Sequence, residues 1–211
     1  FVRKLQPGLE SQVANIADEI AYNNHDVDDG LRADLISINE LRKCEIIEEH
    51  YQFTIDRWPG IKGRLLSNEL IRRMINSLVT DLVETSKARI ESARFQTIDD
   101  VRNAGKATIL LGEDMQRKHI QLKRFLGRNL YNHDKVRDMA QKSKHIVTKL
   151  FEAYIDNPGL LPDKPDSTFS DKTGGLTANS KECMIKDYIA GMTDRFAIIE
   201  YERIMKQGGS I

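Results

Sequence analysis

The chain has 211 residues, and 32 Lys and Arg balance 32 Asp and Glu, so its formal charge at pH 7 is zero. This balance disfavours a strongly basic nucleic-acid binder, although a local basic groove stays open. The apolar fraction of 40% suffices for a core, and the length suits one domain or two small ones. Two distant cysteines, Cys44 and Cys183, rule out a disulfide framework and fit a reducing, cytoplasmic compartment. No apolar run reaches membrane-spanning length, so we expect no membrane partner.

Apolar residues recur at helical spacing along most of the chain, which predicts an all-α fold. The pattern from Leu9 predicts a first helix that stops near Gly30, followed by one or two helices in residues 31–55. The sequence Trp-Pro-Gly at 58–60 interrupts the pattern, because Pro and Gly disfavour helix continuation. A long helix is then expected over residues 62–93.

The second half of the chain continues the helical pattern with three interruptions. Residues 95–109 are mixed, and residues 107–111 could form a short strand. A helix is expected over 113–131 and, after a break at 132–134, another through Tyr154. Residues 157–180 contain three of the five prolines, which predicts a loop, and a single final helix is expected over 181–205.

The most informative stretch lies in the first predicted helix. Asp18, Tyr22 and Asp26 are spaced i, i+4 and i+8, so they share one helix face beside apolar neighbours. A carboxylate next to a buried face costs free energy unless it is paired or bound to a metal. By spacing alone, a solvated polar stripe is the favoured interpretation. The adjacent pairs His25-Asp26 and His133-Asp134 are individually more typical of capping or surface pairs.

Residues 17–26, Ala-Asp-Glu-Ile-Ala-Tyr-Asn-Asn-His-Asp, together with Asp-Asp-Gly-Leu at 28–31, closely resemble a signature of a known family. That family is the bacterial deoxyguanosine-triphosphate triphosphohydrolases and related dNTP triphosphohydrolases, in the HD-domain phosphohydrolase superfamily. Residues 187–197 resemble its C-terminal signature. Weaker resemblances occur in order between them, at 123–126, 129–133, 149–153 and 160–162. The resemblance implies the C-terminal portion of an all-α, HD-domain-like hydrolase with a long central helix.

The resemblance also implies roles for the residues of the first helix. Asp18 matches the last metal ligand of the family, and a carboxylate oxygen suits divalent Mg or Mn. Tyr22 and Asp26 match positions that contact the deoxyribose of the substrate. There a carboxylate can accept a hydrogen bond from the 3′-hydroxyl, and a stacked Tyr can exclude a 2′-hydroxyl. By this alignment His25-Asp26 is not the metal-binding dyad of the superfamily.

The family's other metal ligands, a His and an adjacent His-Asp pair, precede the residue that Asp18 matches. None of the 17 residues before Asp18 is a His, and the chain opens on Phe1 rather than Met. We therefore expect the C-terminal part of a longer enzyme, with the missing N-terminal half as its partner. We expect the fragment to be inactive alone, with no catalytic residue assignable within it, and part of the first helix to expose apolar surface.

The resemblance suggests a division of the chain into four segments. Residues 1–56 form the last part of the HD catalytic core, and residues 57–156 form a helical C-terminal region. Residues 157–180 form a Pro/Gly-rich loop, and residues 181–211 form a C-terminal helix.

Two functions follow from these observations. The first is metal-dependent hydrolysis of a deoxynucleoside triphosphate, dGTP favoured, to deoxynucleoside and triphosphate, by a homo-oligomer as in related enzymes. The second is a non-catalytic helical module that oligomerises or binds nucleotide or single-stranded DNA. Its basic patch would comprise Arg57, Lys62, Arg64, Arg72 and Arg73, for which a solvated helix face is the favoured alternative. A solvated face is also favoured over a metal cluster for Glu45, Glu48, Glu49 and His50.

Overall fold

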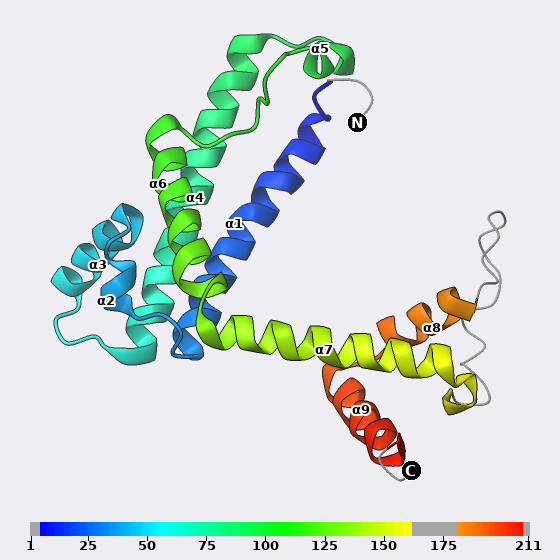
Figure 1. Cartoon of the computed structure of the whole chain (residues 1–211). Coiled ribbons are helices and arrows are strands. Elements are labelled where there is room, and N and C mark those ends of the chain that lie inside the picture. The colour runs from blue at the N-terminus through cyan, green and yellow to red at the C-terminus, as the bar shows by residue number, and fades with distance from the viewer. Residues whose placement is uncertain (1–4, 162–180, 209–211) are drawn as a thin grey trace. The chain divides into compact units, whose positions relative to one another are not determined.

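The computed structural model describes residues 5–161 and 181–208, and every regular element within those ranges is a helix (Figure 1). The all-α prediction is therefore confirmed. Contacts divide the chain into two compact units, residues 1–133 and residues 134–211. This boundary reflects packing, and the four-segment division made from the sequence stays a prediction. In the described ranges, each helix is too short or too polar to cross a lipid bilayer.

The first unit is built on three helices, α1 (Leu9–Arg32), α4 (Gly63–Ala93) and α6 (Glu113–Leu126). Figure 1 shows α1 running antiparallel to α4, and α6 packs against α1. Both α4 and α6 also carry α3 (Glu45–Arg57). The shorter elements are α2 (Ile38–Leu41), α5 (Ile98–Arg102) and the π-helical turn η1 (Gly127–Tyr131). The predicted long helix is confirmed, and of the one or two helices predicted in residues 31–55 the structure forms two, α2 and α3.

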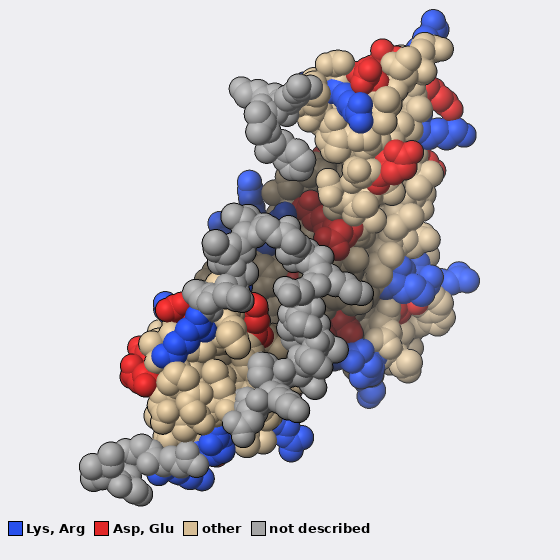
Figure 2. Space-filling view, turned by 90° about the vertical axis from the view of Figure 1, so that its right-hand side faces the viewer, with Lys and Arg blue, Asp and Glu red and all other residues tan. Residues whose placement is uncertain are grey.

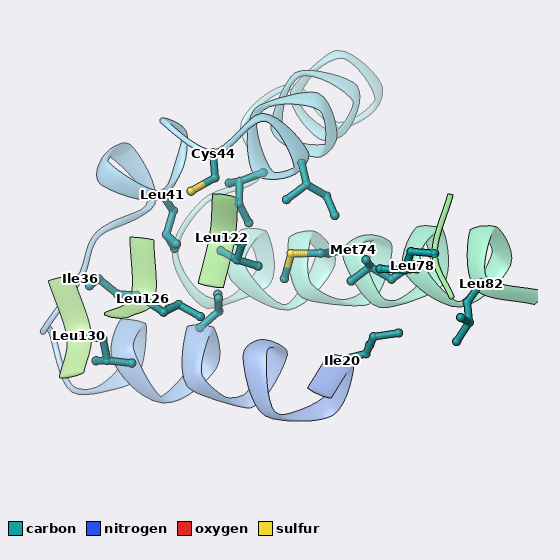
Figure 3. Close-up of a cluster of buried hydrophobic side chains, with 14 of the residues drawn as sticks. Ile20, Ile36, Leu41, Cys44, Met74, Leu78, Leu82, Leu122, Leu126 and Leu130 are labelled. Atoms are coloured by element: carbon teal, nitrogen blue, oxygen red, sulfur yellow. The ribbon is translucent and has the colours of Figure 1, made fainter. Parts of the chain in front are cut away.

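The core of the first unit lies where these helices meet. Figure 3 shows Ile20 of α1, Met74 and Leu78 of α4, and Leu122 and Leu126 of α6 gathered in one cluster. The last four of these residues are fully buried. Burial of such side chains stabilises the fold by roughly 1.5–3 kcal/mol each. The core therefore fixes α1, which carries the candidate site residues, against α4 and α6.

Gly30 does not stop the first helix as predicted, because α1 continues to Arg32. The glycine is needed for packing. A Cβ at position 30 would lie 2.8 Å from Ile36 Cδ1 and 3.2 Å from Leu130 Cδ1. The chain turns just after α1, where the backbone N–H groups of Leu35 and Ile36 donate to the Gly30 carbonyl. A glycine thus allows this turn and η1 to approach the helix closely.

The possible strand at 107–111 is not formed. The backbone N–H groups of this segment donate to side chains, and not to the carbonyls of a neighbouring strand. Gln12 Oε1 accepts hydrogen bonds from the backbone N–H groups of Thr108 (2.7 Å) and Ile109 (3.1 Å). Ser86 Oγ accepts from the N–H of Leu110 at 3.3 Å. This extended connection is thereby held against α1 and α4.

The second unit contains α7 (Asp134–Asp156), the 3₁₀ turn η2 (Pro158–Leu160), α8 (Lys181–Ala190) and α9 (Asp194–Gly208). The prediction of a single helix over 181–205 is wrong, because residues 191–193 separate α8 from α9. The N–H of Gly191 still bonds to the α8 carbonyl of Asp187, whereas the Thr193 hydroxyl accepts from the N–H of Phe196 and starts α9. Most of the loop predicted for 157–180 lies outside the described residues, which end at 161 and resume at 181.

A separate core with a buried polar group holds the second unit together. Leu150, Tyr154 and Ile185 are fully buried. The Tyr154 hydroxyl donates to Glu200 Oε1 at 2.8 Å, and Arg203 donates to both oxygens of the same carboxylate. Tyr188, from the motif that resembles the family's C-terminal signature, packs edge-on against the Tyr154 ring. In the described residues this motif therefore contributes packing.

Candidate functional site

The residues Asp18, Tyr22 and Asp26, here called the α1 stripe, lie on α1 as their spacing predicts. Asp18 is exposed, Tyr22 is 63% exposed and Asp26 is half-buried. Successive members are four residues apart, so the stripe extends about 12 Å along the helix axis. The stripe is thus a polar surface on which Asp18 and Asp26 stand at opposite ends.

A residue distant in the sequence joins the stripe at its Asp26 end. The hydroxyl of Tyr131 donates a short hydrogen bond to Asp26 Oδ2. Tyr131 is the last residue of the π-helical turn η1, which directly follows α6, and the hydrogen bond to Asp26 places its hydroxyl beside α1. Burial, with the bond to Asp26 as a second cause, raises the pKa of Tyr131 to about 12. The phenol therefore stays protonated at neutral pH and acts as a donor.

Behind the stripe, a polar cluster around the buried His119 and Asn23 joins α1 to α6. Glu19 Oε1 lies 2.8 Å from Lys123 Nζ and 3.5 Å from His119 Nε2. Asn23 Nδ2 lies 3.0 Å from the same His119 nitrogen. His119 is fully buried, and burial lowers its pKa despite the nearby Glu19. The imidazole is therefore neutral at pH 7, with Nε2 near both Asn23 and Glu19, and the bond from Lys123 lowers the pKa of Glu19.

This cluster was not predicted from the sequence, where His119 appears among apolar residues of a helical pattern. Asn23 and Glu19 are neighbours of Tyr22 and Asp18 in the chain. The cluster therefore holds the segment of α1 that presents the stripe. One signal was present in the sequence. Glu19 and Asn23 directly follow Asp18 and Tyr22, so they form a second polar row on the adjoining face of the same helix.

The acidic cluster considered as a metal site consists of ion-paired and hydrogen-bonded residues. Glu45 pairs with Arg117 at 2.5 Å and Glu49 with Lys118 at 2.7 Å. Arg42 donates two hydrogen bonds to Glu48, and these lower the pKa of Glu48 to about 2. His50 Nε2 lies 2.9 Å from Ser77 Oγ. These contacts are those of a charged helix surface.

The basic patch is partly neutralised within α4. Arg72 and Arg73 each lie 2.7 Å from Glu69 Oε1. The Arg73 guanidinium also stacks over the rings of Phe53 and Trp58, at 4.2 Å and 5.2 Å from their centroids. On the face shown in Figure 2, basic and acidic side chains are interspersed. The arrangement of these two arginines is thus explained by contacts within the unit.

A largely apolar groove of about 680 Å³ lies between α1 and α4. We call it the α1–α4 groove. Its walls include Val13, Ala17 and Ala21 from α1 and Ile75, Val79 and Val83 from α4. His25 and Asp28 line the groove, whereas the three residues of the α1 stripe lie on the adjoining face of the helix.

The described residues do not complete a metal site. Within residues 5–161 and 181–208, no group of three or more His, Cys, Asp or Glu side chains is placed to hold an ion. Asp18 offers one exposed carboxylate. Octahedral Mg or Mn sites take several oxygen ligands, so the donors present do not fit a complete divalent metal centre.

Comparison with known families finds a similarity in the second half of the chain. Residues 109–203 match a family described as a phosphohydrolase-associated domain. This match spans α6, η1, α7 and α8 and reaches into α9. This part of the chain is therefore similar to a domain that is named for its association with phosphohydrolases.

The curated relatives extend the similarity to nearly the whole chain. A deoxyguanosinetriphosphate triphosphohydrolase-like protein of Azoarcus sp. (strain BH72) is 42% identical over 208 residues, which are 99% of this chain and 52% of that protein. The protein of the same name from Bordetella pertussis is 44% identical over the same shares. The one from Nitrosomonas europaea is 44% identical over 97% of this chain and 52% of its own length. The chain is thus homologous to these triphosphohydrolase-like proteins and spans about half their length.

Proposed function

We propose that the chain is part of a metal-dependent dNTP triphosphohydrolase that converts a deoxynucleoside triphosphate, dGTP favoured, to deoxynucleoside and inorganic triphosphate. The relatives' name supports the reaction class. Asp18 provides one ligand to a divalent Mg or Mn ion, and the remaining ligands come from the half of the enzyme that this chain lacks. The 211-residue chain alone is therefore inactive.

The contact between Tyr131 and Asp26 is the observation that carries this proposal. It brings a phenol from η1 to Asp26, at the end of the α1 stripe that we propose binds the sugar, although the two residues are 105 positions apart. Asp26 keeps a second oxygen with which it can accept a hydrogen bond from a 3′-hydroxyl. Tyr22 and Tyr131 are 63% and 50% exposed, so both rings offer apolar faces to a deoxyribose.

The two ends of the stripe then serve separate parts of the substrate. Asp18 faces the phosphates and Asp26 the sugar, about 12 Å apart along the helix axis. The cluster of Glu19, Asn23 and His119 keeps this segment of α1 in place from behind. The residues of this chain are proposed to bind and orient the metal and the substrate. None of them is assigned a step of the reaction.

The test uses the full-length protein with dGTP and Mg or Mn, and measures deoxyguanosine and inorganic triphosphate by ion-exchange chromatography. Asp18→Ala should reduce turnover to background while the circular dichroism spectrum is unchanged. Asp56→Ala, which removes an exposed carboxylate at the end of α3, is the matched control and should keep full activity. Activity in the Asp18→Ala protein, or triphosphate release by the 211-residue chain alone, would contradict the proposal.

A second candidate function, helical self-association, is favoured by exposed apolar residues on α9. Phe196, Ile198 and Ile199 are 44%, 45% and 57% exposed. Apolar side chains grouped on one helix are typical of subunit contacts. Light scattering of the full-length protein tests it, because Ile199→Asp should lower the oligomer mass and the exposed-site control Lys142→Asp should not. Binding of single-stranded DNA at the basic patch stays a prediction.

A further inference from the structure

The α1–α4 groove presents two apolar rows to solvent. On α1 the row is Val13, Ala17 and Ala21, and on α4 it is Ile75, Val79 and Val83. Each row is spaced i, i+4 and i+8, so each follows one helix face for about two turns. The two helices lie antiparallel (Figure 1), and the groove between them is lined mostly by apolar residues. Rows of this kind are the surface against which a further helix packs.

These residues are exposed, so no element in the described part of the chain covers the groove. Val13, Val79 and Val83 are 47%, 44% and 58% exposed. Contiguous exposed apolar side chains in a concave surface mark a binding interface. An occupant must also satisfy its own backbone hydrogen bonds in apolar surroundings, and an α-helix does so internally.

Asn24 is a buried polar residue in the wall of the groove. Asn24 lines the groove and is 2% exposed, and its Nδ2 donates to the Ile20 carbonyl at 2.7 Å. Among the residues that the structure describes, its Oδ1 is buried with no donor. Because this oxygen is already closed off from solvent, it offers no contact to an occupant, and the apolar rows define the docking surface.

We propose that the α1–α4 groove is the docking surface for an α-helix from the half of the full-length enzyme that this chain lacks. The inference rests on the proposed function, because it takes the chain as part of that longer enzyme. The relatives support the existence of such a half, since this chain aligns over 99% of its own length but 52% of theirs.

The position of the groove on α1 favours this occupant over a second copy of the chain. Ala17 and Ala21 of the groove directly precede Asp18 and Tyr22 of the α1 stripe. A helix docked on the two alanines therefore lies beside Asp18. That placement would bring side chains of the other half next to the single carboxylate that this chain offers to a metal. A metal site with one ligand from this chain and several from the other half of the enzyme requires the two halves to be in contact near Asp18.

The test is photo-crosslinking in the full-length protein. A benzoylphenylalanine replaces Val79 in one variant and Val83 in a second, so that the test stands if either variant fails to fold. The control places the same group at Glu84, which is exposed on α4 and outside the groove. Mass spectrometry of a mixture of ¹⁴N- and ¹⁵N-labelled protein separates contacts within one chain from contacts between copies.

The expected result is a crosslink within one chain, from position 79 or 83 to a helical segment outside residues 1–211, at least about tenfold above the Glu84 control. A crosslink between copies, a crosslink to residues 134–211, or no crosslink above the control overturns the proposal. This readout needs no turnover. The docking proposal can therefore be wrong while Asp18→Ala still abolishes activity. It can also be right in a protein that shows no hydrolysis.

Discussion

The hydroxyl of Tyr131 donates a hydrogen bond to the carboxylate of Asp26, joining the end of η1 to the face of α1 that carries Asp18 and Tyr22. The contact is made between exposed or half-buried side chains, where a purely stabilising bond contributes little. It fixes instead the direction of an acceptor at the candidate sugar-binding end of the stripe. The relationship leads directly to a test of substrate binding.

Tyr131→Phe in the full-length enzyme removes the donor and keeps the ring. Asp26 then loses the bond that orients it, so we expect the KM for the deoxynucleoside triphosphate to rise roughly tenfold, as loss of one charge-assisted hydrogen bond implies. The kcat should change less, because the phenol is assigned to binding. Steady-state kinetics with Tyr201→Phe as the control measures both. An unchanged KM would remove Tyr131 from the site.

The buried His119 predicts a pH dependence of the first unit's stability. Burial lowers its pKa below the ordinary value of 6.5, so the unfolded chain binds a proton where the folded ring stays neutral. The stability that depends on neutral His119 is therefore complete above pH 6.5 and declines as the pH falls from 6.5 toward the lowered folded-state pKa. The slope is at most about 1.4 kcal/mol per pH unit for one such group.

Urea unfolding at pH 7, 6 and 5 measures this slope, with the fluorescence of Trp58, the single tryptophan, as a probe of the first unit. His119→Gln should flatten the pH dependence while the exposed-site control His145→Gln should leave it unchanged. Burial also lowers the pKa of His50, so part of the slope should remain in the His119 variant. Equal slopes in the wild-type protein and His119→Gln would exclude the assignment.

The close packing at Gly30 predicts an unusual response to alanine. In an open helix position, Gly→Ala stabilises a protein by roughly 0.5–1 kcal/mol. At position 30 the new Cβ would meet Ile36 Cγ1 at 2.9 Å, and Ile36 is itself 5% exposed and cannot move freely. We expect Gly30→Ala to lower the free energy of unfolding by about 1–3 kcal/mol. Gly127→Ala, where a Cβ would contact nothing within 4 Å, is the matched control and should be neutral or stabilising. A stabilised Gly30→Ala protein would show that the turn after α1 is not tightly packed.

The sequence predicts the helices of this chain better than it predicts their contacts. Periodicity locates α4 within one residue at its start, because long apolar repeats leave little choice of element. The break between α8 and α9 was missed, since three residues with one glycine give a weak signal against a continuing pattern. Gly30 was interpreted as a helix stop because its actual neighbours, Ile36 and Leu130, are brought to it by tertiary packing.

The candidate site shows the same division between local and distant information. The common face of Asp18, Tyr22 and Asp26 follows from helical spacing and was predicted. Tyr131 lies in a segment that resembles the family, yet its partner is 105 residues away and no local pattern identifies it. His119 has an apolar position in the helical repeat, and only the structure reveals the Glu19 and Asn23 that face it.

The buried carboxylate of the second unit supports a final prediction. Glu200 is 7% exposed, accepts from the fully buried Tyr154 hydroxyl and pairs with Arg203 at 2.5 Å. Glu200→Ala leaves that hydroxyl buried without its acceptor and removes the ion pair, so the second unit should lose about 3 kcal/mol of stability. The second unit contains no tryptophan, so fluorescence does not report on it. Hydrogen exchange of peptides from α7 and α9 measures the loss of stability instead. Glu152→Ala, which removes an exposed carboxylate of α7 paired with Lys149, should leave exchange unchanged. Equal protection in the two variants would mean that apolar packing of Leu150 and Ile185 alone holds the unit together.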